Sequence, residues 1–267
     1  MSMQLHFAFS SNITGAAMFA GRPYFCAGTG TPEELERCAN LDFSVNELFG
    51  AVYDFYQAGH IDAPANLADD RVFIFTGTLD WLNGHGFYNR DMYKNFVSER
   101  NVASELGMEA MHCYPTEDFG PDCNQDKFPF ICDCDYYGAF EALNWLYREA
   151  LIRPAPFMDL EGTYAFFDQT EFFDPERPDF ASMDEKGFIY IPETLAGIFP
   201  TGSGYMEVAE MNDIIILFPQ TIRSETEPMN PNGCWDFLGF TGPNYVWKDG
   251  VQMMILKKMI DRIVYGV

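Results

Sequence analysis

Two runs of this sequence are apolar at almost every position, and they constrain the fold more than any other feature. Residues 71–76 (RVFIFT) are rich in β-branched and aromatic side chains and end at Gly77. Residues 213–220 (DIIILFPQ) place four aliphatic side chains in succession and end in a proline turn. A strand that is apolar on both faces is covered by structure on both sides, as in parallel sheets flanked by helices. The two runs therefore predict buried strands of an α/β protein.

Helical and extended patterns alternate along the rest of the chain. An alternation of this kind predicts an α/β fold with a mostly parallel sheet and helices on both faces. No low-complexity tract or linker divides the sequence, so we expect residues 1–267 to form a single domain. The further strands are expected at 14–20, 108–111 and 187–192, with an extended piece at 164–167, and the helices at 32–58, 88–106, 136–152 and 251–265.

The charge of the chain excludes several classes of partner. Forty acidic residues against sixteen basic ones give a formal net charge of −24, which repels nucleic acid and anionic membrane surfaces. No run of 18 apolar residues is present, so no membrane span is expected. The acidity is typical of a solvated surface, and a cation-binding role is the alternative, although no calcium-binding loop motif occurs. Hydrophobic residues make up 48% of the chain, which is ample for a core.

Seven cysteines leave the cellular compartment open. Cys26 with Cys38, and Cys123 with Cys134, bracket irregular stretches, as disulfide-linked loops do. Reduced thiols in the cytosol are the alternative, and the N-terminal residues lack the basic and apolar regions of a secretory signal. The C-x-C pair at 132–134 has no second pair at ligand spacing, so we expect no metal site.

Two polar residues occupy positions where α/β enzymes carry reactive groups. Asp80 follows the strand at 71–76, and His112 follows the short strand expected at 108–111. Loops at the carboxyl ends of strands meet at one edge of the sheet, where a carboxylate can orient the imidazole of a Ser-His-Asp relay. Alternatively, Asp80 is a turn former or helix cap and His112 a polar loop residue.

A serine nucleophile is not evident in the sequence. No G-x-S-x-G motif occurs, and Ser203 in TGSGY has the wrong glycine spacing for a nucleophile elbow. Cys113 is no substitute, because neighbours on an extended chain point to opposite sides. Residues 1–267 therefore offer an acid and a base without their nucleophile.

Several strings, taken in order, resemble the secreted polyhydroxybutyrate depolymerases, which are serine esterases of the α/β-hydrolase class. The match covers nearly the whole chain, and its order is similar to that of the circularly permuted members. The first string resembles the segment directly after the family's nucleophile, and the third resembles its catalytic histidine loop. The strings are MSMQLHFAFSS, GAAMFAGRPYFCA, HCYPTEDFG, PFICDCDYYGA, MDEKGFIYIP, MNDIIILFPQ and NPNGCWDFLGF.

This resemblance implies roles for particular residues. Asp80 would be the triad acid and His112 the triad base, and Trp235 would be an aromatic at the mouth of the site in contact with polyester. It also implies an extracellular, cofactor-independent esterase that acts on polyesters or short-chain esters, and we expect a monomer. The implied disulfides are Cys26–Cys38 and Cys123–Cys134.

The chain departs from the family pattern in two places. By extension of the matched register, the nucleophile elbow is expected about five residues before Met1. The family's strand and H-G-C oxyanion loop are replaced by a short Pro/Gly-rich linker between Ile191 and Tyr205, which leaves Cys234 without its partner. We therefore expect an incomplete hydrolase domain that lacks two central strands and has marginal stability against the usual range of about 5–15 kcal/mol.

Three functions stay open from the sequence. The leading hypothesis is a polyester hydrolase that keeps only Asp80 and His112 of its triad. The second is a non-catalytic relative that binds polyester through the aromatic stretch between Trp235 and Trp247, although these side chains could equally be ordinary core. The third is an acidic cation-binding protein.

Overall fold

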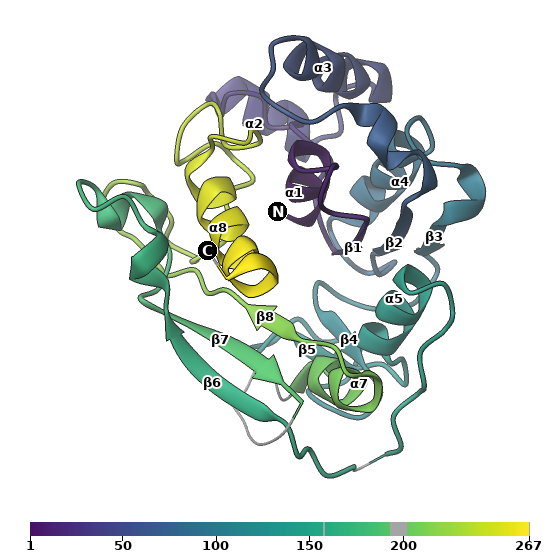
Figure 1. Ribbon diagram of the computed structural model, residues 1–267. Coiled ribbons are helices and arrows are strands. Elements are labelled where there is room, and N and C mark those ends of the chain that lie inside the picture. Colours follow the sequence, from purple (N-terminus) through teal and green to yellow (C-terminus); the bar gives the residue numbers. More distant parts are fainter. Residues whose placement is uncertain (157, 193–201, 267) are drawn as a thin grey trace.

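Helices and strands are interspersed along the chain (Figure 1). The computed structural model describes residues 1–156, 158–192 and 202–266. The strands are β1 (Gly15–Phe19), β2 (Arg71–Phe75), β3 (Val102–Glu105), β4 (Tyr114–Thr116), β5 (Ile131–Asp133), β6 (Thr163–Asp168), β7 (Lys186–Ile191) and β8 (Ile216–Phe218). The helices are α1 (Ser2–Ala8), α2 (Pro32–Ala39), α3 (Val45–Gln57), α4 (Asn83–Tyr93), α5 (Gly138–Leu146), α7 (Tyr205–Asn212) and α8 (Val251–Tyr265), with short 3-10 turns at Pro64–Asp69, Glu99–Asn101, Gln169–Phe172 and Pro178–Ala181.

The first sheet is parallel, in the order β1-β2-β3. Its central strand β2 is buried on both faces. Successive side chains of a strand point to opposite sides, so its residues enter two different clusters. Val72 and Ile74 enter the core formed with α1, α3 and α4, whereas Phe73 and Phe75 enter a second cluster with Ala142 of α5. The prediction of a strand covered on both faces is thus confirmed for β2.

The helices of the first half differ from the predicted ranges. The helix expected at 32–58 is two helices, because Leu41 adopts a left-handed backbone and Ser44 caps the start of α3 through Glu47 N. The helix expected at 88–106 was wrong beyond Tyr93. Val102 and its neighbours pair with β2 instead, so the strand expected at 108–111 is a loop, and β3 takes its place earlier in the chain.

A third sheet, in the order β6-β7-β8, is antiparallel, whereas β4 and β5 form a separate parallel pair. The expected mostly parallel arrangement therefore describes β1–β5 and not this sheet. One face of the antiparallel sheet packs on α7, with Tyr190, Met206 and Phe218 in a common cluster. Among the residues that the structure describes, the strands thus form three hydrogen-bonded sheets. The linker expected to replace a family strand lies largely at 193–201, outside the described residues.

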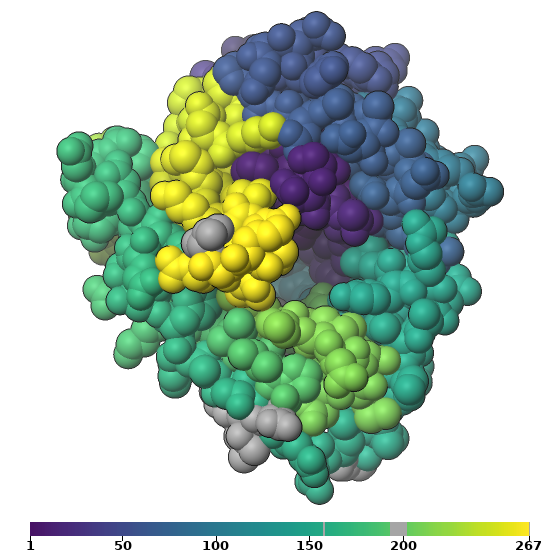
Figure 2. Space-filling view, in the orientation of Figure 1, coloured from purple at the N-terminus to yellow at the C-terminus, as the bar shows by residue number. Residues whose placement is uncertain are grey.

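Helix α8 packs between the N-terminal segment and the segment at 172–183. Its Ile255, Leu256 and Met259 are buried in a cluster against which Met1 and Leu5 of the α1 region also pack. Figure 2 shows α8 (yellow) beside the N-terminal segment (purple) on one face of the molecule. In the described part of the chain, no helix combines the length and apolar character needed to cross a membrane.

Candidate active site

Asp80 and His112 are brought together by the loops that follow β2 and β3. The backbone N–H of Thr78 donates to the carbonyl of Met108 (2.7 Å), and that of Leu79 donates to the carbonyl of Ala110 (3.1 Å). Gly77 permits this approach, because a Cβ atom there would lie 2.0 Å from the Ala110 carbonyl oxygen. The two loops are therefore fixed to each other at the carboxyl edge of the parallel sheet, as expected for a site in an α/β fold.

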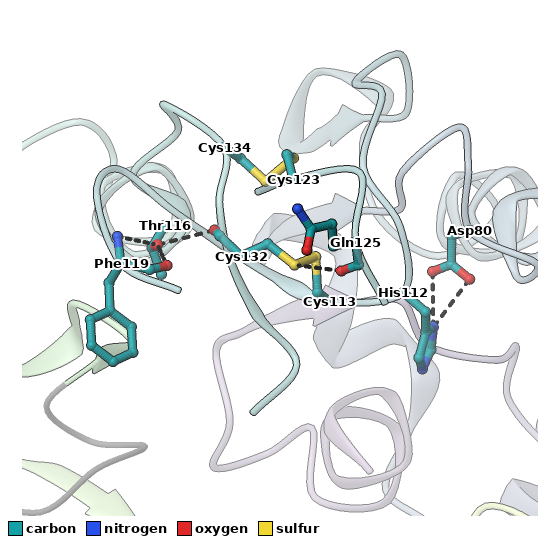
Figure 3. The surroundings of a disulfide bond; sticks show 9 residues. All are labelled: Asp80, His112, Cys113, Thr116, Phe119, Cys123, Gln125, Cys132 and Cys134. Carbon is teal, nitrogen blue, oxygen red and sulfur yellow. Dashed lines mark hydrogen bonds and ion pairs between the residues drawn. A yellow bond between two sulfur atoms is a disulfide. The ribbon is translucent and has the colours of Figure 1, made fainter. Parts of the chain in front are cut away.

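The Asp80 carboxylate and the His112 ring face each other (Figure 3). His112 Nδ1 lies 3.0 Å from Oδ2 and 3.1 Å from Oδ1 of Asp80, and Oδ1 also accepts from Leu82 N–H at 2.7 Å. The Asp80 side chain is fully buried, whereas a third of the His112 side chain is exposed. No hydrogen bond to His112 Nε2 occurs within the described residues, so this nitrogen is available to a group arriving from solvent.

The electrostatics of the pair favour a basic imidazole. The hydrogen bond that His112 donates to Asp80 raises the pKa of His112 above its ordinary value, against partial burial, which lowers it. The charge of Asp80 and that of the exposed Asp126 act in the same direction as the hydrogen bond, and the charge of Arg22 acts against them. A carboxylate that binds Nδ1–H fixes the tautomer in which Nε2 accepts a proton, which is the arrangement that general-base catalysis needs.

Two disulfides hold the loop that carries His112 (Figure 3). Cys123–Cys134 is present as the resemblance implies, and Cys113–Cys132 is a further bond that the sequence did not predict. Cys113 directly follows His112, so the second bond fixes the backbone beside the imidazole. Its signal in the sequence was weak, because Cys113 and Cys132 become neighbours only through the parallel pairing of β4 with β5.

A third disulfide, Cys26–Cys38, begins a few residues after the turn that follows β1. This turn carries Arg22, whose guanidinium carbon lies 5.5 Å from the ring centroids of both Trp81 and Phe237. Trp81 is in turn 5.3 Å from the His112 ring and is 64% exposed. Phe237 belongs to the aromatic stretch that the sequence offered for binding, whereas sequence reasoning missed Arg22 and Trp81, although Trp81 directly follows Asp80 and could have been found there.

Trp235 lies outside the group formed by Arg22, Trp81 and Phe237. It packs, partly buried, against the cluster around Phe172 and Met259, whereas Phe237, two residues further on, joins the aromatic group beside His112. The assignment of Trp235 to the mouth of the site therefore stays a prediction. Cys234 is the one free cysteine. In the described ranges, no three His, Cys, Asp or Glu side chains gather closely enough to hold a metal ion.

Comparisons with known proteins find relatives that are all polyhydroxybutyrate depolymerases. The chain is 30% identical to a poly(3-hydroxybutyrate) depolymerase of Delftia acidovorans, with all of the chain and 58% of that protein aligned. It is 28% identical to a polyhydroxybutyrate depolymerase of Talaromyces funiculosus, again with all of the chain and with 86% of that protein aligned. The chain thus spans little more than half the length of the bacterial relative. No protein-family model matches.

Solved structures agree in fold. A PHB depolymerase variant complexed with an R3HB trimer superposes with a TM-score of 0.87 and 26% identity, over 98% of this chain and 91% of that one. The crystal structure of PHB depolymerase from Penicillium funiculosum gives a TM-score of 0.86 and 27% identity over the same shares.

Proposed function

The chain is a homologue of the polyhydroxybutyrate depolymerases along its whole length, and on that premise we propose that it serves the hydrolysis of poly(3-hydroxybutyrate)-type polyesters. The observation that carries this proposal is the Asp80–His112 pair, a buried carboxylate bound to a partly exposed imidazole at the carboxyl edge of a parallel sheet. The relatives supply the substrate class, and the pair supplies the chemistry.

In the proposed reaction His112 acts as the base. Its Nε2 takes the proton of a serine hydroxyl as the serine oxygen attacks the ester carbonyl, and later returns the proton to the leaving alkoxide. Asp80 holds Nδ1–H and stabilises the imidazolium that forms. Water then cleaves the acyl-serine ester, which releases a carboxylic acid and regenerates the serine hydroxyl. No step of this acyl transfer requires a metal or an organic cofactor.

The serine is the open part of the proposal. Residues 1–267 contain no G-x-S-x-G motif, so we propose that a segment outside these residues supplies the nucleophile and its strand, in the circularly permuted order of the family. We also propose that these residues form one monomeric domain. Three disulfides support an oxidising compartment, and hence an extracellular location.

A second candidate is a polyester-binding protein without turnover. It is favoured by the lack of a nucleophile motif in residues 1–267. It is also favoured by the exposed Trp81 beside His112, since exposed aromatic side chains are typical of binding surfaces.

Adsorption and turnover on amorphous poly(3-hydroxybutyrate) granules separate the two functions. The gene's full-length product should release 3-hydroxybutyrate, and H112Q should abolish the release. His60, whose ring stacks on Trp247 at 3.6 Å, gives the matched control H60Q, which should retain full release. Adsorption without release would favour the binding protein, and the absence of both would refute both functions.

A further inference from the structure

Arg22 lies at the edge of the sheet that carries the Asp80–His112 pair. Strands β1 and β2 are parallel, so the turn after β1 and the loop after β2 emerge side by side. The turn is fixed by Ala20 N–H donating to Phe75 O (2.9 Å) and by the Asn89 side chain donating to Gly21 O (2.7 Å). Arg22 is therefore presented by rigid backbone, close to the loop that carries Asp80.

The Arg22 guanidinium lies over two aromatic rings and has no acidic partner among the described residues. Its carbon lies 5.5 Å from the ring centroids of both Trp81 and Phe237. Its only hydrogen bond within the described residues is a weak one from Nη1 to Cys38 Sγ at 3.6 Å. Partial burial lowers the pKa of Arg22, but an arginine stays charged at neutral pH. A half-buried cation is thus held beside the site with most of its N–H donors free.

Arg22 differs from the other arginines that lie over an aromatic ring. Five more arginines of the described chain lie over an aromatic ring, and each of them also pairs with a carboxylate. These pairs are Arg71–Glu149, Arg90–Asp91, Arg153–Glu117, Arg177–Asp174 and Arg262–Glu171. In a protein with 40 acidic residues, Arg22 alone in this group has no such partner. Its donors are therefore available to an anion from outside the chain.

The chemistry of the proposed substrate supplies that anion. Every ester bond of a hydroxyalkanoate chain that is hydrolysed leaves a fragment ending in a carboxylate. The planar guanidinium binds carboxylates through two parallel N–H donors, and its apolar faces tolerate the aromatic walls that Trp81 and Phe237 provide. The Trp81 ring centroid lies 5.5 Å from the Arg22 guanidinium carbon and 5.3 Å from the His112 ring centroid. A chain end bound at Arg22 would thus leave a nearby ester beside the imidazole.

We propose that Arg22 is a specificity-determining residue that binds the ionised carboxyl end of hydroxyalkanoate oligomers. The inference rests on the proposed function and deepens it. It makes short oligomers with a free acid end, rather than the interior of the polymer chain, the preferred ligands of this site.

Isothermal titration of the gene's full-length product, carrying H112Q so that the ligands are not hydrolysed, tests the inference with two ligands. The ligands are the (R)-3-hydroxybutyrate trimer as its free acid, which is ionised at neutral pH, and the same trimer as its methyl ester. The acid should bind about tenfold more tightly or better, because a hydrogen bond to a charged group is the stronger kind. Equal affinities would overturn the inference without any Arg22 variant being needed.

Variants then assign the preference to Arg22. R22M keeps an apolar stem between the rings and should lose the preference, whereas R22K keeps the charge and should retain part of it. R90M is the matched control, because Arg90 also lies over a ring but pairs with Asp91, and it should bind as the parent does. A preference that survives in R22M would overturn the assignment.

The outcome separates this inference from the proposed function. Ester binding without a preference for the acid refutes the role of Arg22 and leaves a polyester hydrolase standing. A preference for the acid in a protein whose full-length form never hydrolyses the polymer supports Arg22 and removes the hydrolase.

Discussion

Replacement of Asp80 by Asn removes one charge from the pair while keeping the shape of the side chain. In the structure the carboxylate accepts from His112 Nδ1 and from Leu82 N–H, and its side chain is fully buried. The amide can still accept one of these hydrogen bonds, so the loop should keep its conformation. The main effect expected is therefore a fall in the pKa of His112.

The size of that fall follows from the contact that is lost. A hydrogen bond to a charged group contributes about 1.5–3 kcal/mol, and each pKa unit corresponds to about 1.4 kcal/mol. Because a third of the His112 side chain is exposed, solvent screening places the contribution of the lost contact at the lower end of that range. Burial still lowers the pKa in the variant, so it should fall to or below the ordinary value of 6.5.

Proton NMR titration of the histidine ring signals measures this directly, since the chain has only four histidines. H112Q identifies the signal of His112 by its absence. D126N is the matched control, because Asp126 raises the pKa of His112 through its charge alone and is exposed. A fall in D126N as large as in D80N, or no fall in D80N, would refute the idea that the direct hydrogen bond tunes His112.

Four further predictions follow from the Asp80–His112 pair, from a disulfide beside it and from two glycines. The full-length enzyme should gain activity as pH rises through a midpoint above 6.5, because His112 must be neutral to act as a base and its pKa is raised; a midpoint below 6.5 would contradict this. The stability that charged His112 gains from its carboxylate is present below pH 6.5 and lost above the raised pKa, so the Tm cost of D80N should shrink as pH rises. The Cys113–Cys132 bond closes a separation of 19 residues. Its removal in C113A/C132A should lower the unfolding free energy measured in urea by about 3 kcal/mol. An unchanged unfolding midpoint would refute the structural role of this bond. G77A should lower the Tm, because the added methyl group clashes with the carbonyl of Ala110. G50A should raise the Tm, because Gly50 lies in a helix and its side-chain position faces open space. A Tm change of the same sign in both variants would contradict this packing.

Part of the fold was predictable because it depends on local pattern. The apolar run of β2 specified a strand covered on both faces, and the amphipathic pattern at 251–265 specified α8. The segment 102–105 (VASE) has no such pattern. It becomes β3 only because its backbone pairs with β2, and that long-range pairing overrides a helical spacing. The same contact shifts the strand that precedes His112.

The candidate site divides in the same way. Asp80 could be picked out because it follows β2, which the sequence predicted. His112 was picked out after a strand expected at 108–111 that is a loop, and its contact with Asp80 comes from β2 and β3, which end at one edge. Arg22 lies in a turn that carries no motif, and nothing in the spacing places it beside Trp81 and Phe237. Likewise, seven cysteines allow many pairings, and only the neighbouring β4 and β5 select Cys113–Cys132.

Release of 3-hydroxybutyrate from amorphous polymer by the gene's full-length product, measured beside H112Q, tests the central claim most directly. The account predicts steady release that falls by at least about a thousandfold in H112Q, because the imidazole is the base of the relay. Release that H112Q leaves unchanged, or adsorption without any release by the parent protein, would contradict it.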